Sequence, residues 1–234
     1  MNTKSAQVMV FTPHPDDAES GAAGTVARWI AEGKDVIYVV CTNGDKGTSD
    51  ITIRPSELAL IREKEQLAAA DLLGVKEVIF LRYPDQGLED SIEFRKDVVR
   101  LIRIYRPEIV VTVDLSRRYI WHRDHRITGR VVLDAVVTYA SSANAYPELL
   151  EQGLRPHQVS EVLLWGSPEP NYRSDITCTF DTKLAALFCH KSQVGDTLSP
   201  EARERRRERH MMLAEGEDFE LAEAFRRIEL GGIC

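Results

Sequence analysis

A short stretch near the amino terminus, TPHPDDAESGAAGT, crowds one imidazole and three carboxylates together at His14, Asp16, Asp17 and Glu19. An ordinary turn gains nothing from such crowding, because neighbouring carboxylates repel one another unless a positive charge lies among them. A proline on each side of His14 disfavours helix there, so a rigid turn holds His14 and Asp17 three residues apart. An imidazole and a carboxylate at that spacing suit a small divalent cation.

A second stretch, WHRDHR, places His122 and His125 three residues apart. We expect them near the start of a helix over Asp124–Tyr139, where residues at this spacing share one face. This stretch would supply the third ligand. Two histidines and one carboxylate leave an open coordination position on zinc, which is typical of a catalytic site.

A simpler interpretation of the first stretch is a helix N-cap. In that case Asp16 or Asp17 accepts backbone N–H groups, and the helix dipole favours the acids. The second histidine-rich stretch favours the metal site over the cap, because a cap needs no histidines elsewhere in the chain.

These residues need a scaffold that brings them together, and the chain shows an alternation of strands and helices. Apolar runs typical of buried strands occur at Val8–Phe11, Val36–Cys41, Glu77–Leu81, Glu108–Val113 and Glu161–Trp165. Helical spacing is found at Ala22–Glu32, with a start near Asp17–Ser20, and at Ser56–Leu73 and Phe94–Tyr105. The alternation predicts an α/β fold with a mostly parallel, doubly wound sheet.

Ligands of such sheets gather at the carboxyl ends of the strands. Three stretches are expected at such ends: the first stretch above, TNGDKGT (Thr42–Thr48), and the segment Asp114–His125. Gly33 and Gly74 each follow a predicted helix, where a left-handed cap is favoured.

Beyond Trp165 the pattern weakens, and we expect one domain over residues 1–234. PEPNYRSD is predicted to be a loop, TCTFD a short strand, and Lys183–His190 and Pro200–Leu230 helices. The charge run Glu201–His210 is typical of a solvated helix face with internal salt bridges.

Composition narrows the classes of partner. The 234 residues include 37 acidic against 30 basic side chains, a net charge of -7, so we expect repulsion of nucleic acids. No apolar run reaches the length of a membrane span, and no secretion signal is evident, so we expect a cytoplasmic protein. Four scattered cysteines without a CxxC pair predict reduced thiols.

The motifs HPDDAESGAAGT, TNGDKGT, IREKEQLAAADLLG, HRDHR and HKSQ, in this order, resemble the LmbE-like (PIG-L) family of zinc-dependent N-acetylglucosaminyl deacetylases. The resemblance runs from about residue 8 to about residue 193, and HPDDAE with HRDHR is its specific part. It implies a Rossmann-like three-layer α/β sandwich, in agreement with the strand and helix pattern.

The resemblance also implies roles for individual residues. His14, Asp17 and His125 would bind Zn²⁺ or another divalent transition metal, and Asp16 would be the general base. His122 would assist the chemistry without holding metal, and Asp124 would orient or polarise a histidine. Arg123 replaces a proline of the usual family motif, which would place a cation near the pocket.

Substrate contacts are predicted at three positions. Arg62 matches a family position that approaches substrate, although it could equally be a solvated helix arginine paired with Glu65 or Gln66. Asp45 and Thr48 either line the pocket or belong to a simple turn. Further candidates with both a functional and a structural interpretation are His190 in HKSQ, Tyr119 and Trp121.

The predicted function is removal of acetate from an N-acetylglucosamine-containing small molecule, by metal-activated water with an Asp general base. One alternative is a metal-dependent phosphohydrolase, for which Asp114 would be an extra acid. A second is a sugar-binding family member without catalysis. The resemblance further implies a homo-oligomer.

Overall fold

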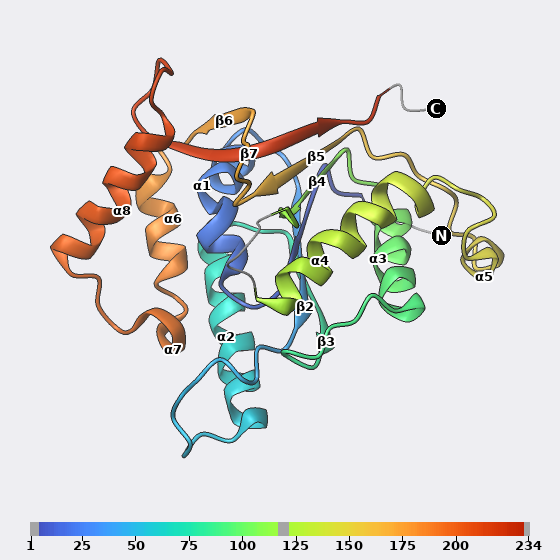
Figure 1. The fold of residues 1–234 in the computed structure, drawn as a ribbon, viewed down its shortest axis with the longest axis horizontal. Coiled ribbons are helices and arrows are strands. Elements are labelled where there is room, and N and C mark those ends of the chain that lie inside the picture. The colour runs from blue at the N-terminus through green and yellow to red at the C-terminus, as the bar shows by residue number, and fades with distance from the viewer. Residues whose placement is uncertain (1–4, 117–121, 232–234) are drawn as a thin grey trace.

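The computed structural model describes residues 5–116 and 122–231 (Figure 1). Its sheet has seven strands in the order β3-β2-β1-β4-β5-β7-β6. The first five are β1 (Val8–Thr12), β2 (Val36–Thr42), β3 (Glu77–Tyr83), β4 (Ile109–Val113) and β5 (Glu161–Trp165). These five pair in parallel, while β7 (Ala222–Glu229) pairs antiparallel with β5 and with β6 (Tyr172–Asp175). The predicted α/β class with a mostly parallel sheet is confirmed.

Helices cover both faces of this sheet, because alternate residues of the buried strands point to opposite sides. On one side, Met9 and Ile37 belong to the core that contains Val98 and Val131 of α3 (Ile92–Tyr105) and α4 (Arg123–Asp134). On the other side, Val10 packs in a core with residues of α1 (Asp17–Ala31), α2 (Pro55–Leu73) and α6 (Phe180–Leu187). The remaining helices are α5 (Pro147–Glu151), α7 (Lys191–Val194), α8 (Pro200–Leu213) and the π-helical turn η1 (Ala135–Tyr139).

Local signals explain the first helices well. Gly33 and Gly74 follow α1 and α2 with φ of 88° and 82°, as expected for left-handed residues at helix ends. The predicted helix over Asp124–Tyr139 is instead α-helical only to Asp134 and continues as η1. No helix in the described ranges has the length and apolar character needed to cross a lipid bilayer.

The prediction of one helix over Pro200–Leu230 is wrong. Helix α8 ends at Leu213, and after a turn with Gly216 at φ of 89° the chain forms β7. Helix-favouring residues such as Ala222 and Ala224 lie in this strand because the open edge of β5 offers backbone hydrogen bonds and a buried face.

The strand predicted at TCTFD is also wrong, since the strand lies just before it, within the predicted loop. Strand β6 covers Tyr172–Asp175 and pairs with β7. Asp175 Oδ1 then accepts a hydrogen bond from the Thr177 backbone N–H at 2.8 Å, which turns the chain toward α6. The sequence could not show that a partner strand would arrive from residues 222–229.

Candidate active site

The turns after β1 and β3 and the start of α4 meet at the carboxyl edge of the sheet. The turn after β1 is held by β2, because both the backbone N–H and the hydroxyl of Thr42 donate to the Pro13 carbonyl at 2.9 Å. The hydroxyl of Thr12 donates to the His14 carbonyl at 3.1 Å. Asp16 adopts φ of 99°, a left-handed conformation that a non-glycine residue rarely takes.

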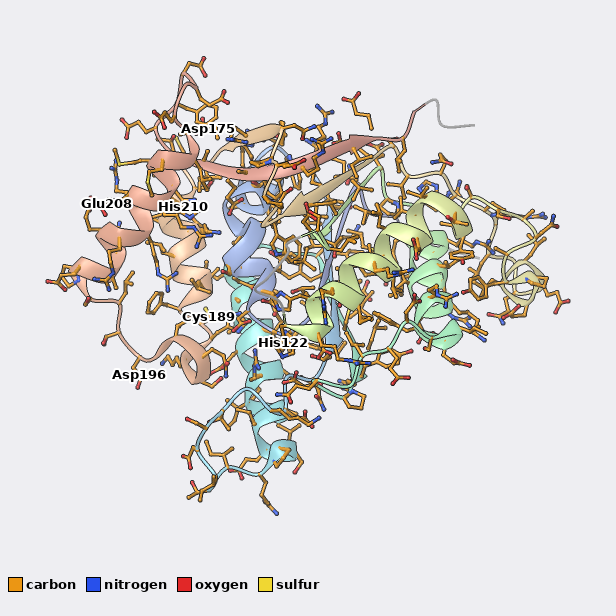
Figure 2. All side chains as sticks on the ribbon, in the orientation of Figure 1. His122, Asp175, Cys189, Asp196, Glu208 and His210 are labelled. Atoms are coloured by element: carbon orange, nitrogen blue, oxygen red, sulfur yellow. The ribbon has the colours of Figure 1, made fainter. Side chains whose placement is uncertain are left out.

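His14, Asp17 and His125 converge at this edge. The Oδ2 atom of Asp17 lies 2.9 Å from His14 Nδ1 and 3.1 Å from His125 Nε2. His122 joins them from the start of α4, with its ring centroid 4.6 Å from that of His14 (Figure 2 labels His122). Ring nitrogens of the three histidines lie within 4.8 Å of one another.

Two further acids approach the other nitrogen of His14. Its Nε2 atom lies 3.1 Å from Asp85 Oδ1 and 3.3 Å from Asp124 Oδ2. Asp124 is fully buried and also accepts hydrogen bonds from the backbone N–H groups of Gln86 and Leu88. Asp85 was missed in the sequence, although its position just after β3 is the same strand-end signal that identified the other stretches.

The pKa values in the cluster reflect this concentration of acids. Burial opposes a charged imidazole, but hydrogen bonds to three carboxylates raise the pKa of His14 to about 11. Burial alone would raise the pKa of Asp17, yet His125 and His14 outweigh it and hold that pKa well below its usual range. For Asp16, burial and then the charge of Asp17 raise the pKa to about 7. The cluster therefore favours a resident positive charge.

The donor set suits a divalent metal ion. Asp17 Oδ2 lies within about 3 Å of both His14 Nδ1 and His125 Nε2, and two imidazoles with one carboxylate are ligands that zinc accepts. Carboxylates on the far nitrogen of His14 would orient that ligand, a usual arrangement around metal-bound histidine.

A second group, His14, Asp85, His122 and Asp124, also gathers within 4.8 Å. It is the weaker candidate because both carboxylate oxygens of the fully buried Asp124 already accept backbone N–H groups, from Gln86 and Leu88.

The N-cap interpretation of Asp16 and Asp17 is wrong. Asp16 occupies the cap position of α1, but its side chain makes no cap hydrogen bond. Asp17 Oδ2 accepts from the backbone N–H of His14, outside the helix, at 3.1 Å. The carboxylate of Asp16 is therefore available to the cleft.

Arg62 and Gln66 of α2 contact Asp16 and hold it in position. Arg62 is 3% exposed and donates to the carbonyls of Pro15, at 2.6 Å, and Gly44, at 3.0 Å. Its guanidinium also lies 3.4 Å from Asp16 Oδ2, and the Gln66 side-chain oxygen accepts from the Asp16 backbone N–H at 3.2 Å. The interpretation of Arg62 as a solvated surface arginine is wrong.

His122 and Arg123 begin α4 in different environments. His122 is the N-cap, and its Nδ1 accepts a hydrogen bond from the Asp124 backbone N–H at 3.3 Å. Burial lowers the pKa of His122, a shift toward the neutral ring that this cap requires. Arg123 donates to the Leu88 carbonyl at 3.1 Å and does not line the cleft described below.

A cleft of about 270 Å³ opens over the cluster. It is lined by His14, Asp16, Lys46, Gly47, Arg62, Asp85, Gln86, His122, His125 and Gln193. The loop TNGDKGT thus reaches the cleft through Lys46 and Gly47, whereas Asp45 and Thr48 do not line it. Thr48 Oγ1 accepts from the Asp50 backbone N–H in an exposed turn.

The remaining candidates lie apart from the cleft or outside the described residues. His190 is fully buried, with its Nε2 3.3 Å from Glu19 Oε2. Glu19 in turn accepts from Gln66, so His190 belongs to a buried polar row behind Asp16. Tyr119 and Trp121 fall outside the described residues. Asp114 does not line the cleft, and its Oδ1 accepts from the Ser116 backbone N–H at 2.7 Å.

Comparison with known proteins adds independent information. The profile of the PIG-L family, described as GlcNAc-PI de-N-acetylase, matches residues 9–136. Diacetylchitobiose deacetylase of Thermococcus kodakarensis is 37% identical over 187 residues, covering 80% of this chain and 70% of that protein. A probable N-acetyl-alpha-D-glucosaminyl L-malate deacetylase 2 of Bacillus anthracis is 28% identical, covering 84% of this chain and 85% of that protein.

A solved structure agrees with the sequence comparisons. N,N'-diacetylchitobiose deacetylase from Pyrococcus horikoshii, in complex with its inhibitor MPG, superimposes with a TM-score of 0.87 at 35% identity. The match covers 96% of this chain and 84% of that chain. The profile match over residues 9–136 includes the turn after β1 and the start of α4, the two segments that supply the histidine cluster.

Proposed function

Because this chain belongs to the PIG-L family of de-N-acetylases, we propose that it removes the acetyl group from an N-acetylglucosamine-containing small molecule. The relatives described above carry names of deacetylases that act on such molecules. The proposal for this chain adds a metal site and assigns individual roles to its residues.

We assign His14, Asp17 and His125 as the metal ligands and zinc as the metal. Asp17 Oδ2 lies within about 3 Å of a ring nitrogen of each histidine, and the acids around His14 favour a cation there. A zinc ion in such a site lowers the pKa of water and polarises an amide carbonyl. Asp124 and Asp85 hold the far side of the His14 ring and so fix its orientation.

Asp16 acts as the general base. It takes a proton from the water that attacks the acetamide carbon, and it returns that proton to the nitrogen of the departing amine. Arg62 and the backbone contact with Gln66 hold Asp16 in position beside Asp17. A fixed carboxylate loses little freedom when the reaction proceeds.

His122 stabilises negative charge on the acetamide oxygen. Since its Nδ1 accepts the cap hydrogen bond from Asp124, the neutral ring carries its proton on Nε2. That N–H is then available as a donor toward the cleft that His122 lines. The products are acetate and a free amine.

One observation carries this proposal: Asp16 lines the same cleft as His14 and His125 without being needed as a helix cap. The test is release of free amine from N,N'-diacetylchitobiose and from simple N-acetylglucosamine conjugates by the zinc-supplemented protein. We expect turnover that a chelator abolishes and that added zinc restores. The absence of amine from every conjugate, with zinc bound, would overturn the proposal.

The two alternative functions are less well supported. A phosphohydrolase with two metals needs further free carboxylates, but Asp114 does not line the cleft, and Asp85 and Asp124 accept backbone hydrogen bonds. A binding protein without catalysis does not need a carboxylate such as Asp16 held beside a metal site.

A further inference from the structure

A second cavity, of about 460 Å³, meets the catalytic cleft at His125. It lies between α1, α6, α8 and the end of β5. Asp17 and Ser20 form its inner wall, Trp165 lies at the end of β5, and α8 contributes Arg206 and Arg209. A molecule bound at the proposed metal site could therefore extend into this space.

Most charged groups in the cavity already have partners. Asp17 faces His14 and His125. Lys183 and Glu223 are buried and lie 2.6 Å apart, and Glu223 also accepts from the backbone N–H groups of α1.

Burial and then the charge of Lys183 lower the pKa of His210, which disfavours a charged ring at this position. Its Nδ1 lies 2.7 Å from the Ala222 carbonyl, to which it donates. These groups therefore contribute little unpaired charge to the cavity.

The two arginines of α8 that line the cavity differ from Arg203 and Arg207 of the same helix. Arg203 pairs with Asp181 and Arg207 with Glu220. Within residues 5–116 and 122–231, Arg206 and Arg209 form no ion pair, and Arg206 lies 6.0 Å from the ring of Phe188. They are three residues apart, so they lie on one face of the helix.

This arrangement changes the interpretation of the charge run in α8. Figure 2 shows His210 between α8 and α6 and Glu208 on the outer side of the helix. Most of the run is solvent-exposed, as expected, but its ion pairs reach Asp181 and Glu220 outside the helix. The partly buried Arg206 and the exposed Arg209 line the cavity.

We propose that this cavity is a subsite for an anionic group, a carboxylate or a phosphate, carried by the aglycone of the amino-sugar substrate. The proposal rests on the proposed deacetylase function. Guanidinium groups bind both anions through charge-assisted, often bidentate hydrogen bonds. The molecule as a whole has a net charge of -7, so a local pair of free cations gives acidic ligands one favoured place to bind.

The experiment compares matched substrates. The first two are N-acetylglucosamine linked through its anomeric oxygen to glycolate and the same conjugate with glycolamide, which differ in charge and little in size. The third is N-acetylglucosamine 1-phosphate. We expect a higher kcat/KM for the glycolate conjugate and for the 1-phosphate than for the glycolamide conjugate. We expect this preference for a charged substrate to weaken as ionic strength rises.

The double variant Arg206→Gln/Arg209→Gln should lower the ratio of kcat/KM for the acid over the amide about tenfold. Arg206→Lys/Arg209→Lys keeps the charge and should retain part of the preference, which controls for a packing effect. Arg205→Gln is the matched control on the same helix, because Arg205 is exposed and does not line the cavity. It should leave the ratio unchanged.

The outcomes separate the two proposals. Free amine from the neutral conjugate, with no preference for either acid, would overturn the anionic subsite and leave the deacetylase function standing. A preference that persists undiminished in the double Gln variant would also overturn it. No free amine from any conjugate would count against the deacetylase function itself.

Binding of the amine product, measured by calorimetry, gives a second readout that does not depend on turnover. The glucosaminyl glycolate should bind the wild-type protein more tightly than the glycolamide, and the double Gln variant should lose that difference. Equal affinity of the wild-type protein for both products would contradict the proposed subsite.

Discussion

At the scale of single residues, Asp16 and Asp17 are neighbours with different tasks. Asp17 lies between two imidazoles, whereas Asp16 lies beside the guanidinium of Arg62. Replacing one carboxylate by an amide of the same size should therefore affect metal and catalysis differently.

We expect Asp17→Asn to lose zinc and activity together, because the anionic ligand is removed. Asp16→Asn should keep about one zinc per chain and lose about 10²–10⁴ in kcat, the usual cost of losing a general base. Metal analysis and steady-state kinetics of both variants measure this. Zinc loss from Asp16→Asn alone would show that the two roles are reversed.

Arg62 invites a second prediction at this scale. Its guanidinium satisfies two buried carbonyls, so Arg62→Ala should destabilise the fold by about 2–4 kcal/mol and lower activity as well. Thermal unfolding of the variant, with the exposed Arg54→Ala as control, measures this. An unchanged melting temperature with a raised KM would instead indicate that Arg62 acts on substrate alone.

At the scale of elements, α4 owes its position to a close approach at Gly129. A Cβ atom at this residue would overlap the carbonyl oxygen of Val113 at the end of β4. Gly129→Ala should therefore displace α4 and with it His122 and His125, costing about 1–3 kcal/mol of stability. Zinc affinity should fall at the same time. Arg126→Ala on the exposed side of α4 is the control, and normal stability and zinc affinity in Gly129→Ala would refute the argument.

Helix α8 is joined to β7 through His210, which gives a prediction for pH. In the folded protein, burial and then the charge of Lys183 lower the pKa of His210 below its unfolded value of 6.5. Its contribution to stability is thus fully present above about pH 6.5 and is lost as pH falls toward the folded pKa. His210→Gln can still donate to Ala222 but does not titrate. Urea unfolding between about pH 8 and pH 5 should show a smaller loss for the variant, and parallel curves would contradict this.

The strands differ in how well the sequence alone predicted them. Strands β1, β2, β4 and β5 were predictable because each is largely buried and reads as a continuous apolar run. Strand β3 is half-buried at the sheet edge but still contains such a run. Strand β7 was not, because its residues favour helix and only pairing with β5 and β6 decides its form. Local propensity therefore gave the wrong secondary structure for β7, because strand pairing in the folded chain determines its conformation.

The candidate site was also predictable only in part. The spacing of the two histidine-rich stretches pointed to a metal site, and the structure brings the two stretches together. The acid Asp85, the buried contacts of Arg62 and the cavity beside α8 depend on distances between segments far apart in sequence. No short motif encodes those distances.

At the scale of the whole molecule, the proposed metal should be a folding ligand. Its proposed ligands come from the turn after β1, the first residue of α1 and α4. The first two segments are more than one hundred residues from α4 and meet it only in the folded chain. Zinc at about 100 times its Kd should add about 2.7 kcal/mol of stability, or about 5–10 °C in Tm. Thermal unfolding with zinc and with chelator tests this. His125→Ala should lose the shift, and equal melting of wild type in both conditions would contradict the assignment.

Strand β7 has a consequence for how the protein is made on the ribosome. Every proposed ligand and catalytic group is translated by residue 125, but β6 has its sheet neighbour only once residues 222–229 appear. Until then, the edge of β5 is open, and Lys183 lacks the carboxylate of Glu223, which also binds the backbone of α1. A nascent chain can thus contain every proposed ligand and catalytic residue while its sheet is still incomplete. The edge of β5 is where we would expect chaperones to act during synthesis.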